Sequence, residues 1–168
     1  MERINDLNLI EEEVFKKVKT LILNIKKIIE DEPFDLTRGI KILEDLRNVN
    51  YEDLNQVQHE AMILRAARSI NFNDFYGHNI EWYWNPRQTG LAQEPDLRGK
   101  IAGEIVVSAQ ITTSENPIGT IDTRMASTLK NLNNMPGKKI YFVRTETMEN
   151  RAKTKVSKCG YQIEIRKV

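Results

Sequence analysis

Two strand-like runs around a short turn constrain this chain more than any other feature. They lie in residues 94–113, EPDLRGKIAGEIVVSAQITT, and the run after Ala102-Gly103 alternates apolar and polar residues. Alternation with a period of two is typical of a strand with one buried face, and two such runs joined by a turn predict a β-hairpin. A hairpin is marginally stable in water by itself, so the segments around it decide the fold.

Those surrounding segments predict a mixed sheet. Residues 78–85 are aromatic and alternate, which favours a strand before the hairpin. Four segments follow it: helical apolar spacing over 120–135, a compact apolar run over 138–145, a basic helix over 147–160 that ends at Gly160, and alternation over 161–168. A helix between two strands favours a parallel crossover, so we expect an α/β (α+β) fold in which helices sandwich a mixed β-sheet.

The residues before this sheet predict helices. Residues 5–31 carry apolar side chains at steps of three and four, and Pro33 ends the pattern. A second helix, capped by Thr37 or Asp35, is expected to reach about Leu46 with Ile40, Leu43 and Leu46 facing inward, and Asn50 is expected to cap a third. We therefore expect a helical region over 1–50 that packs or dimerises, and an α/β core over 51–168.

Composition excludes several kinds of site. The chain has one cysteine, Cys159, and two histidines, so it has neither a disulfide framework nor the ligands of a structural zinc site. Its glycines form no phosphate-binding loop, which argues against a nucleotide cofactor. No apolar run of membrane-spanning length and no signal-like start occurs, so we expect no membrane association and a cytoplasmic location.

Charge is distributed unevenly along the chain. Residues 1–60 hold 14 Asp/Glu and 9 Lys/Arg (net −5), whereas residues 124–168 hold 3 Asp/Glu and 11 Lys/Arg (net +8). A segment this basic is typical of a surface that binds a phosphate backbone, although solvated helix faces have the same composition. Six of these cations are candidates for nucleic-acid contacts: Arg124, Lys130, Arg144, Arg151, Lys153 and Lys155.

Polar residues gather on one face of the predicted hairpin. With Ala102-Gly103 as the turn, Asp96 lies beside Ser108 and Gln110, whereas Glu104 lies about 16 Å from Asp96 at ~3.3 Å per residue. One metal ion cannot bind both carboxylates in that register. A different turn position would bring Glu104 close enough to be an alternative ligand.

A known superfamily shares this arrangement. A Pro-Asp at a strand, a neighbouring strand with a tripeptide at the place of [DE]-x-K, and a following helix and βαβ run resemble the PD-(D/E)XK restriction-endonuclease-like superfamily. The resemblance covers residues 51–168 and implies a restriction-endonuclease-like core with Asp96 as a metal ligand. The tripeptide, Ser108-Ala109-Gln110, departs from the pattern, because serine replaces the usual acid and glutamine replaces the usual lysine.

One branch of this superfamily has serine at the acid position and takes the missing carboxylate from the helix that follows. Asp122 matches that relocated acid by position, and Glu60 matches an acid that an N-terminal helix often contributes. The resemblance implies a DNA endonuclease, restriction or repair-like, that depends on Mg²⁺ (or Mn²⁺) bound by Asp96 and Asp122. Gln110 would orient the attacking water but could not accept its proton, so slow chemistry is expected.

Two further expectations concern partners. Cleavage of both DNA strands needs two active sites, so the resemblance favours a homodimer. The alternative is a non-catalytic protein of the same fold that binds nucleic acid or serves in assembly.

Overall fold

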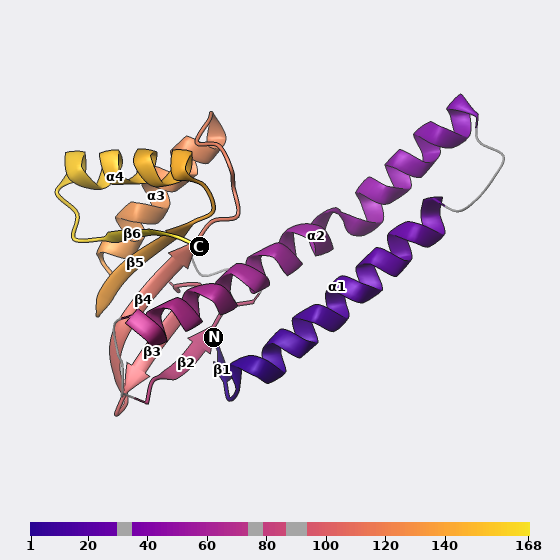
Figure 1. Ribbon diagram of the computed structural model, residues 1–168. Helices are drawn as coiled ribbons and strands as arrows, with labels where there is room; N and C mark the ends of the chain where they lie inside the picture. Colours follow the sequence, from indigo (N-terminus) through magenta and orange to yellow (C-terminus); the bar gives the residue numbers. More distant parts are fainter. Residues whose placement is uncertain (30–34, 74–78, 87–93) are drawn as a thin grey trace. The chain divides into compact units, whose positions relative to one another are not determined.

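The computed structural model describes residues 1–29, 35–73, 79–86 and 94–168, which form two compact units (Figure 1). One unit, the sheet unit, comprises Met1–Asn5 and Met62–Val168, and the other, the helical unit, comprises Asp6–Ala61. The sequence predicts a boundary at residue 50, with the first five residues in the helical part. Pro33, the predicted helix stop, lies outside the described residues, as does most of the loop before the hairpin.

A six-stranded mixed sheet is the centre of the sheet unit, and its strands lie in chain order. They are β1 (Glu2–Ile4), β2 (Glu81–Trp84), β3 (Leu97–Ile101), β4 (Glu104–Ile111), β5 (Lys138–Val143) and β6 (Glu164–Lys167). Strands β1 to β4 pair antiparallel, whereas β4, β5 and β6 pair parallel. The predicted mixed sheet with parallel crossovers is confirmed. Strand β1 was not predicted, because three residues are too few to show alternation.

The hairpin turn lies where the sequence placed it. Ala102 and Gly103 have φ values of 52° and 84°, and Ile101 pairs with Glu104. Two successive residues with positive φ are typical of the tight turns that match the twist of a hairpin, and glycine adopts this conformation without steric cost. Glu104 is therefore exposed at the end of the hairpin opposite to Asp96.

Helices cover both faces of this sheet (Figure 1). On one face, α3 (Thr120–Asn133) and α4 (Glu146–Cys159) bury Leu129 and Met148 against Tyr141 and Val143 of β5. On the other face lie the last turns of α2 (Leu36–Asn73), where Ile63 and Ile70 are fully buried, as are the alternate β5 residues Ile140 and Phe142. Strand β5 is thus apolar on both faces, as its compact apolar run predicted.

The helical unit is a hairpin of α1 (Leu7–Ile29) and the first part of α2, which lie side by side (Figure 1). Carboxylates cap both helices, because Asp6 accepts a hydrogen bond from the Asn8 N–H and Asp35 accepts one from the Arg38 N–H. The prediction of separate helices ending near Leu46 and starting at Asn50 was wrong, since α2 is continuous. An asparagine costs a helix only a few tenths of a kcal/mol or so, and only glycine or proline costs more.

The helical unit has a small core. Val14, Leu21 and Ile42 are its buried apolar side chains among the described residues. The prediction that Ile40 and Leu43 face inward was wrong, because they are 52% and 67% exposed. None of the described helices combines the length and apolar composition that a membrane span requires.

Candidate functional site

Asp96 is a buried carboxylate at the start of β3. Its side chain accepts a 2.7 Å hydrogen bond from the Ile111 N–H, and its carbonyl oxygen accepts one of 2.9 Å from the Asn85 N–H. The residue is only 2% exposed, and the pairing of Leu97 with Ala109 puts it beside Gln110. The carboxylate therefore holds the end of β4 to the start of β3.

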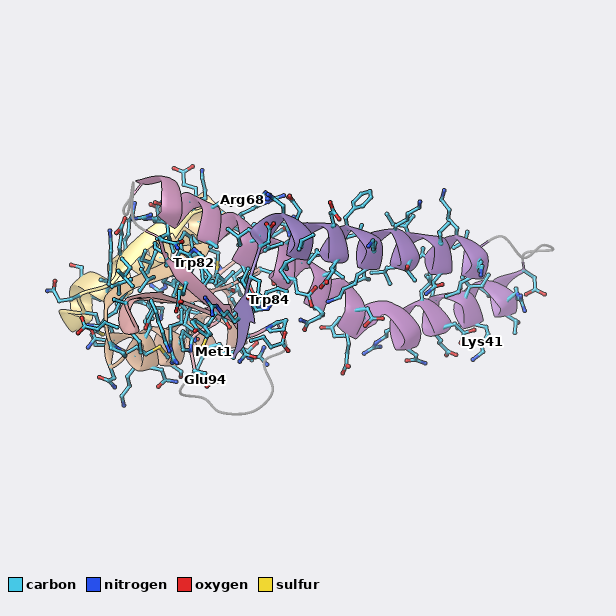
Figure 2. All side chains as sticks on the ribbon, turned by 90° about the horizontal axis from the view of Figure 1, so that it is seen from below. Met1, Lys41, Arg68, Trp82, Trp84 and Glu94 are labelled. Carbon is cyan, nitrogen blue, oxygen red and sulfur yellow. The ribbon has the colours of Figure 1, made fainter. Side chains whose placement is uncertain are left out.

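Ser108 and Gln110 lie on the same face of the hairpin as Asp96, as predicted. The Ser108 hydroxyl is fully buried and donates to the carbonyl oxygen of Pro136 at 2.8 Å. The Gln110 amide donates to the carbonyl oxygen of Glu94 at 3.1 Å, and Glu94 also lies 3.6 Å from the N-terminal amine of Met1 (Figure 2). Both side chains thus tie β4 to neighbouring turns.

The turn that Ser108 reaches is fixed by a glycine. Gly137 has a φ of 76°, and a Cβ there would lie 2.7 Å from the backbone of Val106. Only glycine fits a positive φ and this close approach together. The Pro136 carbonyl oxygen is therefore held over β4, where the serine hydroxyl binds it.

Two hydroxyl side chains that the sequence did not single out complete this cluster. Tyr141 of β5 pairs with Gln110, and its side chain is hydrogen-bonded to Thr112. Burial, together with the negative charge of Asp96, raises the pKa of Tyr141 to about 12, despite the opposing effect of Thr112. Tyr141 lies within an apolar run, so the sequence contained one signal of its role. This signal is its hydroxyl group, which usually has a hydrogen-bond partner when it is buried in a strand.

Asp122 lies in the first turn of α3 and binds two cations of α4. Its carboxylate accepts hydrogen bonds of 2.8 and 2.9 Å from the Arg151 guanidinium and one of 3.0 Å from Lys155. These hydrogen bonds, that of Arg151 first, hold the pKa of Asp122 far below its usual range. The helix N-terminus also favours an acid at this position.

The remaining predicted acids lie elsewhere in the fold. Glu60 belongs to the helical unit, where it is 1% exposed, with its carboxylate 2.8 and 2.9 Å from Lys17 Nζ and 3.2 Å from the Gln56 amide. It is therefore a buried carboxylate that forms an ion pair with Lys17. Glu104 lies at the exposed hairpin end, as expected.

The described residues do not fit a Mg²⁺ ion. Within them, no three His, Cys, Asp or Glu side chains form a group that could hold a metal. Mg²⁺ requires oxygen ligands in a near-ideal octahedron. Asp96 and Asp122 instead bind a backbone N–H and two α4 cations, respectively.

The predicted phosphate-binding residues lie on or beside α3 and α4. Arg151, Lys155 and Lys158 follow each other at steps of four and three, which places them along one side of α4. Arg144 binds Glu115 at 3.2 Å and Lys153 binds Glu149 at 2.7 Å, so each retains donors for other partners. Arg124 and Lys130 of α3 are exposed as well, and Lys158 is an exposed cation that the prediction did not include.

The sequence interpretation omitted a second group of cations. Lys138 and Lys139, at the start of β5, line a shallow hollow with Tyr161 and Glu164. Their position after the Pro136-Gly137 turn marked them only as a strand start. These two lysines add positive charge at the end of the sheet where α3 ends.

The chain matches no family model, no curated protein and no solved structure.

Proposed function

We propose that this chain binds nucleic acid through a basic face on the α3–α4 layer of the sheet unit. The face is defined by seven cations: Arg124, Lys130, Arg144, Arg151, Lys153, Lys155 and Lys158. The observation that carries the proposal is an excess of positive charge on and beside two helices that pack on one face of one sheet: the seven cations stand against three acids of α3 and α4, Asp122, Glu146 and Glu149, a net charge of +4. Lys/Arg contacts with phosphates supply most of the sequence-independent affinity for nucleic acids.

The ion pairs on this face leave donors for phosphates. Asp122 uses Nε and one Nη of Arg151, so the second Nη stays available, as do other donors of Lys155. Asp122, Arg151 and Lys155 together, the Asp122 triad, keep a net charge of +1.

Salt dependence of DNA binding tests the proposal. Replacing Arg124, Lys130 and Lys158 with Ala removes three exposed cations and leaves the Asp122 triad intact. We expect the slope of log affinity against log salt to fall by up to about 2.7, at roughly 0.9 per lost phosphate contact. Fluorescence anisotropy with a labelled DNA duplex measures it.

The matched control removes the same charge from the helical unit. Lys19, Lys26 and Lys27 are exposed on α1, and their replacement with Ala should leave the slope unchanged. If both triple variants lose affinity equally, net charge rather than the basic face governs binding. Absence of duplex binding by the wild-type chain at low salt would overturn the proposal.

A second candidate function is a Mg²⁺-dependent DNA endonuclease with a restriction-endonuclease-like core. One observation favours it: the hairpin register brings Asp96, Ser108 and Gln110 to one face, followed by a helix and a parallel strand. The metal ligands do not come together among the described residues. The proposal of nucleic-acid binding does not depend on cleavage.

Incubation of supercoiled plasmid with Mn²⁺ distinguishes the two candidates. If the chain only binds, the plasmid stays supercoiled at protein concentrations that saturate a duplex. If it cleaves, nicking should disappear in Asp96→Asn, whose amide oxygen can still accept the Ile111 N–H. A melting curve of Asp96→Asn checks that the variant is folded.

A further inference from the structure

Apolar exposure is concentrated in the helical unit. Eleven large apolar side chains are exposed among the described residues, and ten of them lie within Asp6–Ala61. The remaining one is Ile118 of the sheet unit. A contiguous apolar patch of several hundred Å² on a protein surface is typical of an interaction site.

Helix α2 carries these side chains as a regular stripe. Leu36, Ile40, Leu43, Tyr51 and Leu54 are 40–82% exposed and follow each other at steps of four, three, eight and three. Arg47 fills the gap of eight, so the stripe advances 18 residues in five helical turns. This is the spacing by which a helix packs against a partner helix.

Helix α1 extends the same face. Phe15, Ile22 and Ile29 are exposed at steps of seven, and the first two directly follow the buried Val14 and Leu21. On α2, the exposed Leu43 likewise follows the buried Ile42. In two antiparallel helices that pack together, positions one residue after the buried seam turn to the same side, so the two stripes form one outer face. Figure 2 shows side chains projecting outward from both helices.

We infer that a second copy of this chain docks on the outer face, so that the two α2 helices pair antiparallel about a two-fold axis near residues 45–46. About that axis the outer residues of the stripe face apolar residues of the partner: Leu36 opposes the partner's Leu54 and Ile40 opposes the partner's Tyr51. At the centre, Leu43 lies beside the partner's Arg47. The same axis brings Glu44 next to the partner's Arg47, and by symmetry this contact occurs twice. The two opposite charges attract each other, whereas like charges at these positions would repel.

The size of the face fits a homodimer. At roughly 60 Å² of exposed carbon surface for each of the eight side chains, the face offers about 500 Å² of apolar area. Since about 65% of a homodimer interface is apolar, this corresponds to roughly 800 Å² per chain, the area that a stable interface buries on each partner. The inference does not depend on the proposed nucleic-acid binding.

Light scattering coupled to size-exclusion chromatography tests the dimer. The full-length chain should elute as a dimer, and Ile40→Glu, which places a charge against the partner's Tyr51, should elute as a monomer with an unchanged circular-dichroism spectrum. The matched control is Ile118→Glu, which places the same charge on an exposed apolar residue of the sheet unit and should remain dimeric. A monomeric wild-type chain, or a dimer that persists in Ile40→Glu, would overturn the inference.

A charge exchange distinguishes a second copy from any other occupant. Glu44→Arg and Arg47→Glu, each alone, should weaken dimerisation about tenfold or more, because each juxtaposes like charges across the axis. The double variant Glu44→Arg/Arg47→Glu should restore the wild-type dissociation constant to within a few-fold. A double variant as weak as the single ones would contradict the antiparallel register, and sedimentation equilibrium measures all four proteins.

Discussion

The two candidate functions assign different roles to the carboxylate of Asp122. In one it restrains Arg151 and Lys155 beside a DNA backbone, and in the other it is a ligand of the catalytic metal. Its pKa lies below the usual range, so the ion pairs contribute to stability above about pH 4 and are lost as the pH falls through the lowered pKa.

We expect Asp122→Asn to bind a DNA duplex more tightly than the wild-type chain. Removing one negative charge frees two cations on the basic face, and one added phosphate contact steepens the salt slope by about 0.9. Anisotropy titrations at several salt concentrations measure both quantities. Weaker binding in Asp122→Asn, at an unchanged melting temperature, would mean that the carboxylate itself serves the ligand.

For the residues of the hairpin, the sequence predicted which side chains lie together but not which groups they bind. The period of two fixes which side chains share a face, so the proximity of Asp96, Ser108 and Gln110 followed from the sequence. Their partners did not, because Ser108 binds a carbonyl oxygen 28 residues away and Asp122 binds a guanidinium 29 residues away. Such pairs depend on how a turn and two helices pack, which local alternation does not encode.

Among the helices, α4 begins at a cap that also joins it to another segment. The Thr145 hydroxyl accepts a 3.2 Å hydrogen bond from the Met148 N–H and donates one of 2.7 Å to the carbonyl oxygen of Glu115. One side chain thus satisfies a free N–H of the first turn and holds the loop that precedes α3.

Thr145→Ala should lower the free energy of unfolding by about 1–2 kcal/mol, since it removes the cap and the hydrogen bond to Glu115. Urea unfolding followed by circular dichroism measures the change. Thr147→Ala, at an exposed position in the same turn, is the control and should stay within about 0.5 kcal/mol of the wild-type chain. Thr145→Ser should recover most of the loss, and a loss that serine does not recover would assign the effect to the methyl group.

Helix type was easier to predict than helix length. The spacing of apolar residues correctly indicated α1, α3 and α4, but the prediction divided α2 in two because Asn50 resembled a cap. The later part of α2 is stabilised by tertiary packing of Ile63, Ala66 and Ile70. This packing offsets the modest helix propensity of the asparagines near residue 50, so the helix stays continuous there.

At the scale of the molecule, the order of elements determined most of the sheet. Hairpins pair neighbouring strands antiparallel, and helices between strands return the chain in parallel, so the mixed character of the sheet followed from the sequence. The full strand order did not, since β1 was not predicted. The division into units was harder, because α2 contributes to both and no composition change marks residue 61. The exposed apolar stripes of α1 and α2 were expected inside a core. The periodicity of apolar residues shows that a helix face is apolar, but not whether that face packs against the same chain or against another chain.

Both margins of the sheet discourage a seventh strand. The outer strand β1 is three residues long, and on the opposite margin β6 carries Glu164, Arg166 and Lys167 within four residues. A short or charged outer strand is a poor template for another backbone. Among the described strands, growth of the sheet by edge-to-edge pairing between molecules is therefore disfavoured.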